Sequence, residues 1–84
     1  MLVPGDEMYR RIRELREDRD LSQAAVGTAV GVSQRAYAYY ESGQRMITPQ
    51  VLCALAKFYH VSTDYLLGLT DEPAPYPPKK QDRP

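Results

Sequence analysis

The chain has 84 residues, 11 basic and 11 acidic side chains, and one cysteine. This length makes a single small domain, and a single cysteine excludes an intramolecular disulfide. No run approaches the ~18 consecutive apolar residues of a membrane span, and the N-terminus lacks the apolar core of a signal peptide. We therefore expect a cytoplasmic protein with no membrane partner. The formal net charge of zero argues against a generally basic, non-specific nucleic-acid binder, although a local basic face remains compatible with it.

The first predicted element is an amphipathic helix over residues 6–19. Asp6 is placed to cap its N-terminus, and Met8, Ile12 and Leu15 follow the i, i+4, i+7 spacing of one apolar face. We expect this face to pack against the rest of the domain.

Residues 21–43, LSQAAVGTAVGVSQRAYAYYESG, predict two short helices joined by one tight turn. Ser22 and Ser33 stand where the two helices need capping residues, and Gly31 stands where the first must end. Gly27 has no side chain at the place where the two helices approach each other. This arrangement presents the second helix to the major groove of DNA, so it indicates a DNA-binding module.

Two more helices are predicted after a short loop. Thr48 followed by Pro49 is typical of a helix start, and this helix continues to about Tyr59. Ser62 precedes a last short helix that Gly68 ends. No alternating strand pattern is present in residues 1–70, so the predicted fold class is all-α, a compact five-helix bundle.

The composition changes after residue 70. Residues 71–84, DEPAPYPPKKQDRP, are rich in proline and contain no Leu, Ile, Val or Phe. We predict a helix-turn-helix DNA-binding domain over residues 1–70 and a flexible proline-rich tail over residues 71–84. Cys53 lies in the apolar run VLCALAKF and is expected to be a small buried side chain.

The start of the helix after the turn carries the candidate base contacts. Gln forms paired hydrogen bonds with adenine and Arg with guanine, so Gln34 and Arg35 are candidates for contacts in the groove. Taken singly, each of them is better explained as an ordinary solvated side chain, and only the whole pattern favours DNA. Gln23, at the N-terminus of the preceding helix, and Arg45, in the following loop, are candidates for phosphate contacts.

From about Ile12 to Gly68 the chain resembles the phage repressor/Cro-type helix-turn-helix family. The resemblance lies in the segments LREDRDLSQ, GVSQ, YYESGQR and LCALAKFYHVSTDYLLG. It implies a five-helix bundle that binds double-stranded DNA, as a homodimer on a near-palindromic operator, through its second and third helices. For single residues it implies a phosphate contact by Gln23, a groove-facing position for Ser33, Gln34, Arg35 and Tyr39, and a position beside the DNA backbone for Gln44 and Arg45.

The resemblance also implies a partly buried salt bridge between Arg16 and Glu41, which ties the first helix to the recognition helix. This chain departs from the family at two positions. Gly27 stands where Ala is most frequent, and Tyr37 stands where Ile or Val is common. A phenol at the second position needs a hydrogen-bond partner or must reach the surface, so Tyr37 either packs in the core or contacts a phosphate.

The predicted function is that of a sequence-specific transcriptional regulator, a repressor, with the helix at residues 33–42 in the major groove. The alternative is a protein-interaction module, such as an antitoxin, that uses the same fold and docks through its tail. No enzyme is indicated: His60 has no paired nucleophile, and neither a cofactor motif nor a metal-ligand spacing is visible. A homodimer would double the few base contacts of one short helix. Its contact surface is expected among Phe58, Tyr59, Val61, Tyr65, Leu66 and Leu69. Some of these six must fill the core, and the sequence does not show which of them remain exposed.

Overall fold

The described part of the chain consists of five α-helices. The structure is a computed structural model that describes residues 4–77, with side chains from Met8 onward. No strand occurs within these residues, so the predicted all-α class with five helices is confirmed. The helices are α1 (Pro4–Asp18), α2 (Gln23–Val30), α3 (Gln34–Ser42), α4 (Pro49–Tyr59) and α5 (Thr63–Leu67).

Local capping sets the start of the last four helices. In each case a side-chain hydroxyl accepts a hydrogen bond from the backbone N–H three residues later, which satisfies one of the free donors of the first turn. The capping residues are the four predicted from the sequence: Ser22, Ser33, Thr48 and Ser62. The first helix is present, but its predicted start and the capping role of Asp6 were wrong, because α1 already begins at Pro4 and Asp6 lies inside its first turn. Proline at the first helical position is itself favourable.

Residues in the left-handed conformation end the same four helices. Gly31 follows α2 with φ +83°, and Gly43 and Gly68 end α3 and α5 in the same way. His60 takes this conformation after α4, with φ +59°. The turns that these residues make are sharp enough to fold five short helices onto one another.

The hydrophobic core receives one fully buried side chain from each helix. These five are Ile12, Val26, Tyr37, Leu55 and Leu66. Complete burial of a large side chain stabilises a fold by about 1.5–3 kcal/mol, so each helix is held to the bundle at one point at least.

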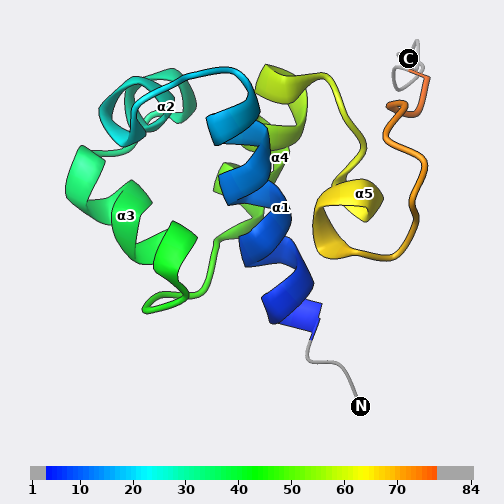
Figure 1. Cartoon of the computed structure of the whole chain (residues 1–84), viewed down its shortest axis with the longest axis horizontal. Helices are drawn as coiled ribbons and strands as arrows, with labels where there is room; N and C mark the ends of the chain where they lie inside the picture. Colours follow the sequence, from blue (N-terminus) through cyan, green and yellow to red (C-terminus); the bar gives the residue numbers. More distant parts are fainter. Residues whose placement is uncertain (1–3, 78–84) are drawn as a thin grey trace, which may run out of the picture.

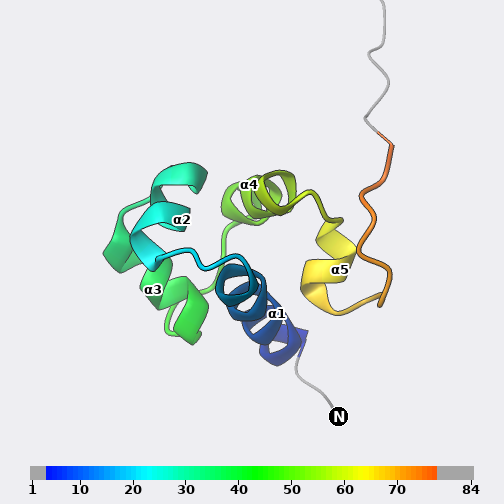
Figure 2. The ribbon, with the colours of Figure 1, turned by 45° about the horizontal axis from the view of Figure 1, so that its top comes forward.

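The two-helix unit α2–α3 lies at one end of the bundle. α1 contacts both α3 and α5, and α4 contacts both α2 and α5. Figures 1 and 2 show the consequence: α2 and α3 lie on one side of α1 and α4, while α5 and the segment after it lie on the other. The outer surface of α3 is therefore not covered by another described helix.

Arg11 of α1 fastens the chain that follows α5. Its side chain is 9% exposed, and Nη1 donates to the carbonyl oxygens of Tyr65 at 2.5 Å and Thr70 at 2.7 Å. Nη2 lies 2.9 Å from a carboxylate oxygen of Asp71, and the guanidinium lies 4.2 Å from the centre of the Tyr65 ring. Apolar periodicity did not point to Arg11, although it stands three residues after Met8 and four before Leu15, on the apolar face of α1.

Residues 70–77, which we call the C-terminal segment, continue along α5. The backbone N–H of Ser62 donates to the carbonyl of Pro73 at 3.1 Å, and the hydroxyl of Tyr76 donates to the carboxylate of Asp64. That residues 71–84 form a flexible tail stays a prediction. Residues 71–77 are exposed but hydrogen-bonded to the domain at these points, and residues 78–84 lie outside the described residues.

One expectation about α4 was wrong, and the six residues of the suggested dimer surface divide between core and surface. Cys53 is exposed, because it lines the open surface of α4 and is not among the residues that this helix buries in the core, which include Leu55 and Tyr59. The expected dimer surface also contained side chains that belong to the core. Of its six residues, the core buries Tyr59, Val61 and Leu66, whereas Phe58 and Leu69 are exposed and Tyr65 is half-buried.

Candidate nucleic-acid interface

A backbone hydrogen bond to a residue within α2 fixes the turn between α2 and α3. The backbone N–H of Val32 donates to the carbonyl of Gly27 at 2.8 Å. A Cβ atom at Gly27 would lie 3.1 Å from the carbonyl oxygen of Val32 and 3.2 Å from that of Ser33. Glycine thus lets α2 approach the backbone of the turn, which fixes the direction in which α3 leaves it.

The first turn of α3 is exposed and polar. Ser33, Gln34 and Arg35 are all exposed, and the Ser33 hydroxyl accepts from the backbone N–H of Ala36 at 3.0 Å. The first N–H groups of a helix have no partner within it and carry its positive dipole end. This end of α3 therefore offers backbone donors, an amide and a guanidinium to an anionic or hydrogen-bonding partner.

A second group of predicted contact residues lies at the other end of α3. Gln44 and Arg45 are exposed in the loop that follows it, and Tyr39 is half-buried. The guanidinium of Arg45 lies 5.1 Å from the centre of the Tyr39 ring, and its backbone N–H donates to the Tyr39 carbonyl at 3.2 Å. These contacts hold Arg45 against α3, a pairing that the sequence spacing did not reveal.

The structure brings Arg16 and Glu41 together as an ion pair. Nε and Nη2 of Arg16 each lie 2.8 Å from a different carboxylate oxygen of Glu41, and Nη1 donates to the carbonyl of Leu21 at 2.9 Å. The side chain of Glu41 is only 5% exposed and that of Arg16 only 16%. The paired geometry links α1, α3 and the connection before α2 in the way the resemblance implies.

Tyr37 and Gln23 also donate to the Glu41 carboxylate. The Tyr37 hydroxyl lies 2.6 Å from Oε2, and Nε2 of Gln23 lies 3.2 Å from Oε1. The idea that Tyr37 contacts a phosphate was wrong, because its side chain is completely buried and its hydroxyl is bound to Glu41. A phosphate contact of Gln23 stays a prediction.

Burial and hydrogen bonding oppose each other in their effects on the pKa of Glu41 and Arg16 but act together on that of Tyr37. Burial alone would raise the pKa of Glu41, but the hydrogen bonds from Arg16, Tyr37 and Gln23 outweigh it and hold that pKa below its ordinary value. Burial, together with the hydrogen bond to Glu41, raises the pKa of Tyr37 above its ordinary value. The hydrogen bond to Glu41 raises the pKa of Arg16. At neutral pH the network therefore holds one carboxylate, one guanidinium and a neutral phenol.

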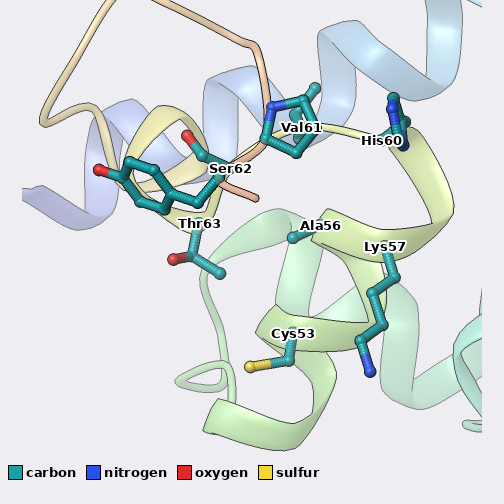
Figure 3. Close-up of a pocket in the computed structure, with 9 residues that line it drawn as sticks. Cys53, Ala56, Lys57, His60, Val61, Ser62 and Thr63 are labelled. Atoms are coloured by element: carbon teal, nitrogen blue, oxygen red, sulfur yellow. The ribbon is translucent and has the colours of Figure 1, made fainter. Parts of the chain in front are cut away.

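An open pocket of about 330 Å³ lies on the side of the molecule that carries α5 (Figure 3). α4 and the turn after it form one wall, and the C-terminal segment forms the other. Its lining residues are Cys53, Ala56, Lys57, His60, Val61, Ser62, Thr63, Pro75 and Tyr76. None of the predicted DNA-contact residues is among them, so pocket and candidate interface are separate surfaces.

Residues 4–77 contain neither a metal-ion site nor a membrane span. No group of three or more His, Cys, Asp or Glu side chains in this range is arranged to hold a metal ion. Over the same residues, every helix is too short or too polar to cross a membrane.

Proteins of similar sequence are regulators. Residues 12–66 match the family described as Helix-turn-helix. The uncharacterized HTH-type transcriptional regulator YobD of Bacillus subtilis (strain 168) is 38% identical over 69 residues, which cover 81% of this chain and 62% of that protein. The cryptic phage CTXphi transcriptional repressor RstR of Vibrio cholerae is 41% identical over 51 residues, which cover 61% of this chain and 46% of RstR. The chain thus spans 62% of the length of YobD and 46% of that of RstR, less than two thirds of either relative.

Solved structures of one phage repressor share the fold. The P22 c2 repressor in complex with a synthetic operator superimposes with a TM-score of 0.66 at 39% identity, covering 70% of this chain and 89% of that one. The solution structure of the DNA-binding domain of the same repressor gives a TM-score of 0.66 at 40% identity, covering 71% and 79%.

Proposed function

The chain belongs to the phage-repressor type of the helix-turn-helix family, and on this basis we propose that it is a sequence-specific DNA-binding transcriptional regulator that acts as a repressor. It places α3 in the major groove of an operator. Side chains at the start of α3 contact base edges, while Gln23 and the loop after α3 contact the DNA backbone.

The observation that carries this proposal is the exposed polar start of α3 on a rigid support. Ser33, Gln34 and Arg35 face solvent, while Tyr37 and Glu41 on the same helix are buried. A base-contacting helix needs such a division, because its side chains must be held to a fraction of an ångström to discriminate between base edges. The chain is similar in fold to a repressor solved on operator DNA.

The proposal extends to a homodimer on a near-palindromic operator in the cytoplasm, where the DNA of a bacterial cell lies. α3 has nine residues, so one copy reaches few base pairs. Two copies on half-sites about one helical turn apart would multiply the specificity. The antitoxin alternative is not favoured, because the matching relatives are transcriptional regulators and a repressor.

Selection of bound sequences from a random duplex pool tests the proposal. We expect enrichment of one near-palindromic sequence, and an affinity for it that falls steeply as salt rises, because phosphate contacts release counterions. If the chain binds no duplex at low salt, the protein-interaction alternative replaces the proposal.

Arg35→Ala separates base contacts from phosphate contacts. We expect the variant to relax a guanine preference at one operator position and to lose about 1–3 kcal/mol of binding free energy on the selected sequence. Arg45→Ala is the matched control: its loss should be similar on all sequences, with a salt slope smaller by about 1. A loss with Arg35→Ala that is uniform across sequences would make Arg35 a phosphate contact instead.

A further inference from the structure

Gln23 is the one predicted DNA-contact residue whose side-chain amide is bound to a buried charged group. It is the first residue of α2, is half-buried, and donates one amide proton to Oε1 of Glu41 at 3.2 Å. The amide nitrogen carries two protons, and its second proton has no partner among the described residues. The hydrogen bond to Glu41 removes most of the rotational freedom of this side chain.

The acceptor of this hydrogen bond, Glu41, is itself held by three further hydrogen bonds. Glu41 receives two hydrogen bonds from Arg16 at 2.8 Å and one from Tyr37 at 2.6 Å, and Arg16 is anchored in turn on the carbonyl of Leu21. Hydrogen bonds of this length to a charged group in a dry environment are strong and allow little movement. The Gln23 amide is thus bound to a carboxylate that residues of α1 and α3 hold in a fixed position.

Charge would otherwise work against a phosphate at this position. An isolated Glu41 carboxylate so close to the Gln23 amide would repel a phosphate that binds there. The Arg16 guanidinium neutralises this charge through its paired contact, and the Tyr37 hydroxyl donates a further hydrogen bond to the carboxylate. The pair carries no net charge, so the amide can approach an anion without penalty from the buried carboxylate.

Resting on the function proposed above, we infer that Glu41, together with Arg16 and Tyr37, is a positioning residue for DNA binding. Glu41 holds the Gln23 amide so that the second amide proton points to a phosphate. Glu41 thereby raises the affinity for the operator without itself touching DNA. Side-chain ordering before binding reduces the entropy lost when the contact forms.

A double-mutant cycle on the selected operator duplex, at one fixed salt concentration, tests this inference. Gln23→Ala is measured in the wild-type chain and in the triple variant Arg16→Met, Tyr37→Phe, Glu41→Met, which removes the polar partners together and leaves no unpaired buried charge. We expect Gln23→Ala to weaken binding about 10-fold in the wild type, as for a lost hydrogen bond to a charged group, and less than about 2-fold in the triple variant. Gln44→Ala, at an exposed residue without contact to Glu41, should cost the same in both backgrounds.

Equal losses for Gln23→Ala in both backgrounds, or no loss in the wild type, would overturn the inference and leave the proposed function intact. Absence of binding by the wild type to any duplex would instead remove the proposed function and the inference with it.

A second measurement serves if the triple variant does not fold. In the free wild-type chain, the side-chain amide protons of Gln23 should exchange with solvent at least several-fold more slowly than those of the exposed Gln50, measured by NMR. Equal exchange rates at the two residues would show that Glu41 does not hold the amide and would overturn the inference.

Discussion

Glu41 is the residue on which donors from three parts of the chain meet. At 5% exposure its carboxylate is almost out of water, and such a charge is tolerated only because each of its oxygens is hydrogen-bonded. The same donors give the recognition helix its fixed orientation relative to α1. Loss of Arg16 or Tyr37 is therefore expected to lower stability, in addition to the effect on DNA binding inferred above.

Arg16→Ala removes the cationic partner and leaves the buried carboxylate of Glu41 without its countercharge. We expect a loss of about 3 kcal/mol in the free energy of unfolding, measured by urea denaturation. Arg10→Ala is the control, because the Arg10–Glu14 pair has the same charges but side chains that are 50% and 51% exposed. Its loss should stay below about 1 kcal/mol. Unchanged melting of the Arg16 variant would contradict a structural role for the pair.

Alkaline pH acts on the two buried tyrosines. Burial raises the pKa of Tyr59 from 10.0 to about 12 in the folded chain, and that of Tyr37 is raised as well. The unfolded chain thus loses these protons first. The stability that depends on the neutral phenols is complete below pH 10 and is lost as the pH rises from 10 through 12.

Phenolate absorbance measured against pH checks this expectation. Tyr37 and Tyr59 should ionise above pH 10 in the folded chain, whereas all seven tyrosines should titrate together in denaturant. Tyr59→Phe should remove one late-ionising group. If all tyrosines of the wild type ionise in a single transition near pH 10, at a pH where the chain is still folded, the burial of Tyr37 and Tyr59 is contradicted.

At the scale of helices, the ends of the helices could be predicted from the sequence, whereas the residues on their buried faces could be predicted only in part. Ser22 and Ser33 cap the helices that the sequence predicts because capping acts within three residues of the chain. The burial of Arg11 and the exposure of Cys53 depend on which elements α1 and α4 pack against. Residue type alone suggests the opposite in both cases, because arginine is usually exposed and cysteine usually buried. Two contacts of Glu41 join residues far apart in the sequence, Gln23 at 18 positions and Arg16 at 25, so only the family resemblance pointed to the Arg16–Glu41 pair.

The C-terminal segment is the element whose role differs most from a simple linker. Its hydrogen bonds to Arg11, Ser62 and Asp64 tie it to α1, to the turn before α5, and to α5 itself. We propose that the folded domain extends to about residue 77 and not to residue 70.

Removal of residues 71–84 tests this boundary. We expect a loss of about 1–2 kcal/mol in the free energy of unfolding, because the buried N–H of Ser62 loses its acceptor and Tyr76 no longer contacts Asp64. Removal of residues 78–84 alone is the control and should change stability by less than about 0.5 kcal/mol. Equal stability of the wild type and both truncated chains would restore the boundary at residue 70.

At the scale of the whole molecule, the two ends of the bundle have different surfaces. α2 and α3 form one end, with exposed amide and guanidinium groups, and α5 with the C-terminal segment forms the other. The second end carries the pocket and the exposed apolar side chains of Leu69 and Tyr76, which are 68% and 65% exposed. We expect DNA at the first end only, while contacts between two copies would use the rest of the surface.

Titration of the isotope-labelled chain with the selected operator duplex, followed by amide chemical shifts in NMR, tests the central claim that α3 is the recognition helix. We predict that the largest shift changes occur at the start of α2, in the first two turns of α3 and at residues 43–46. Any second group at α5 should appear only where two copies meet, and should shrink on a half-site duplex. Changes confined to α4, α5 and the C-terminal segment, with α3 unaffected, would contradict the account.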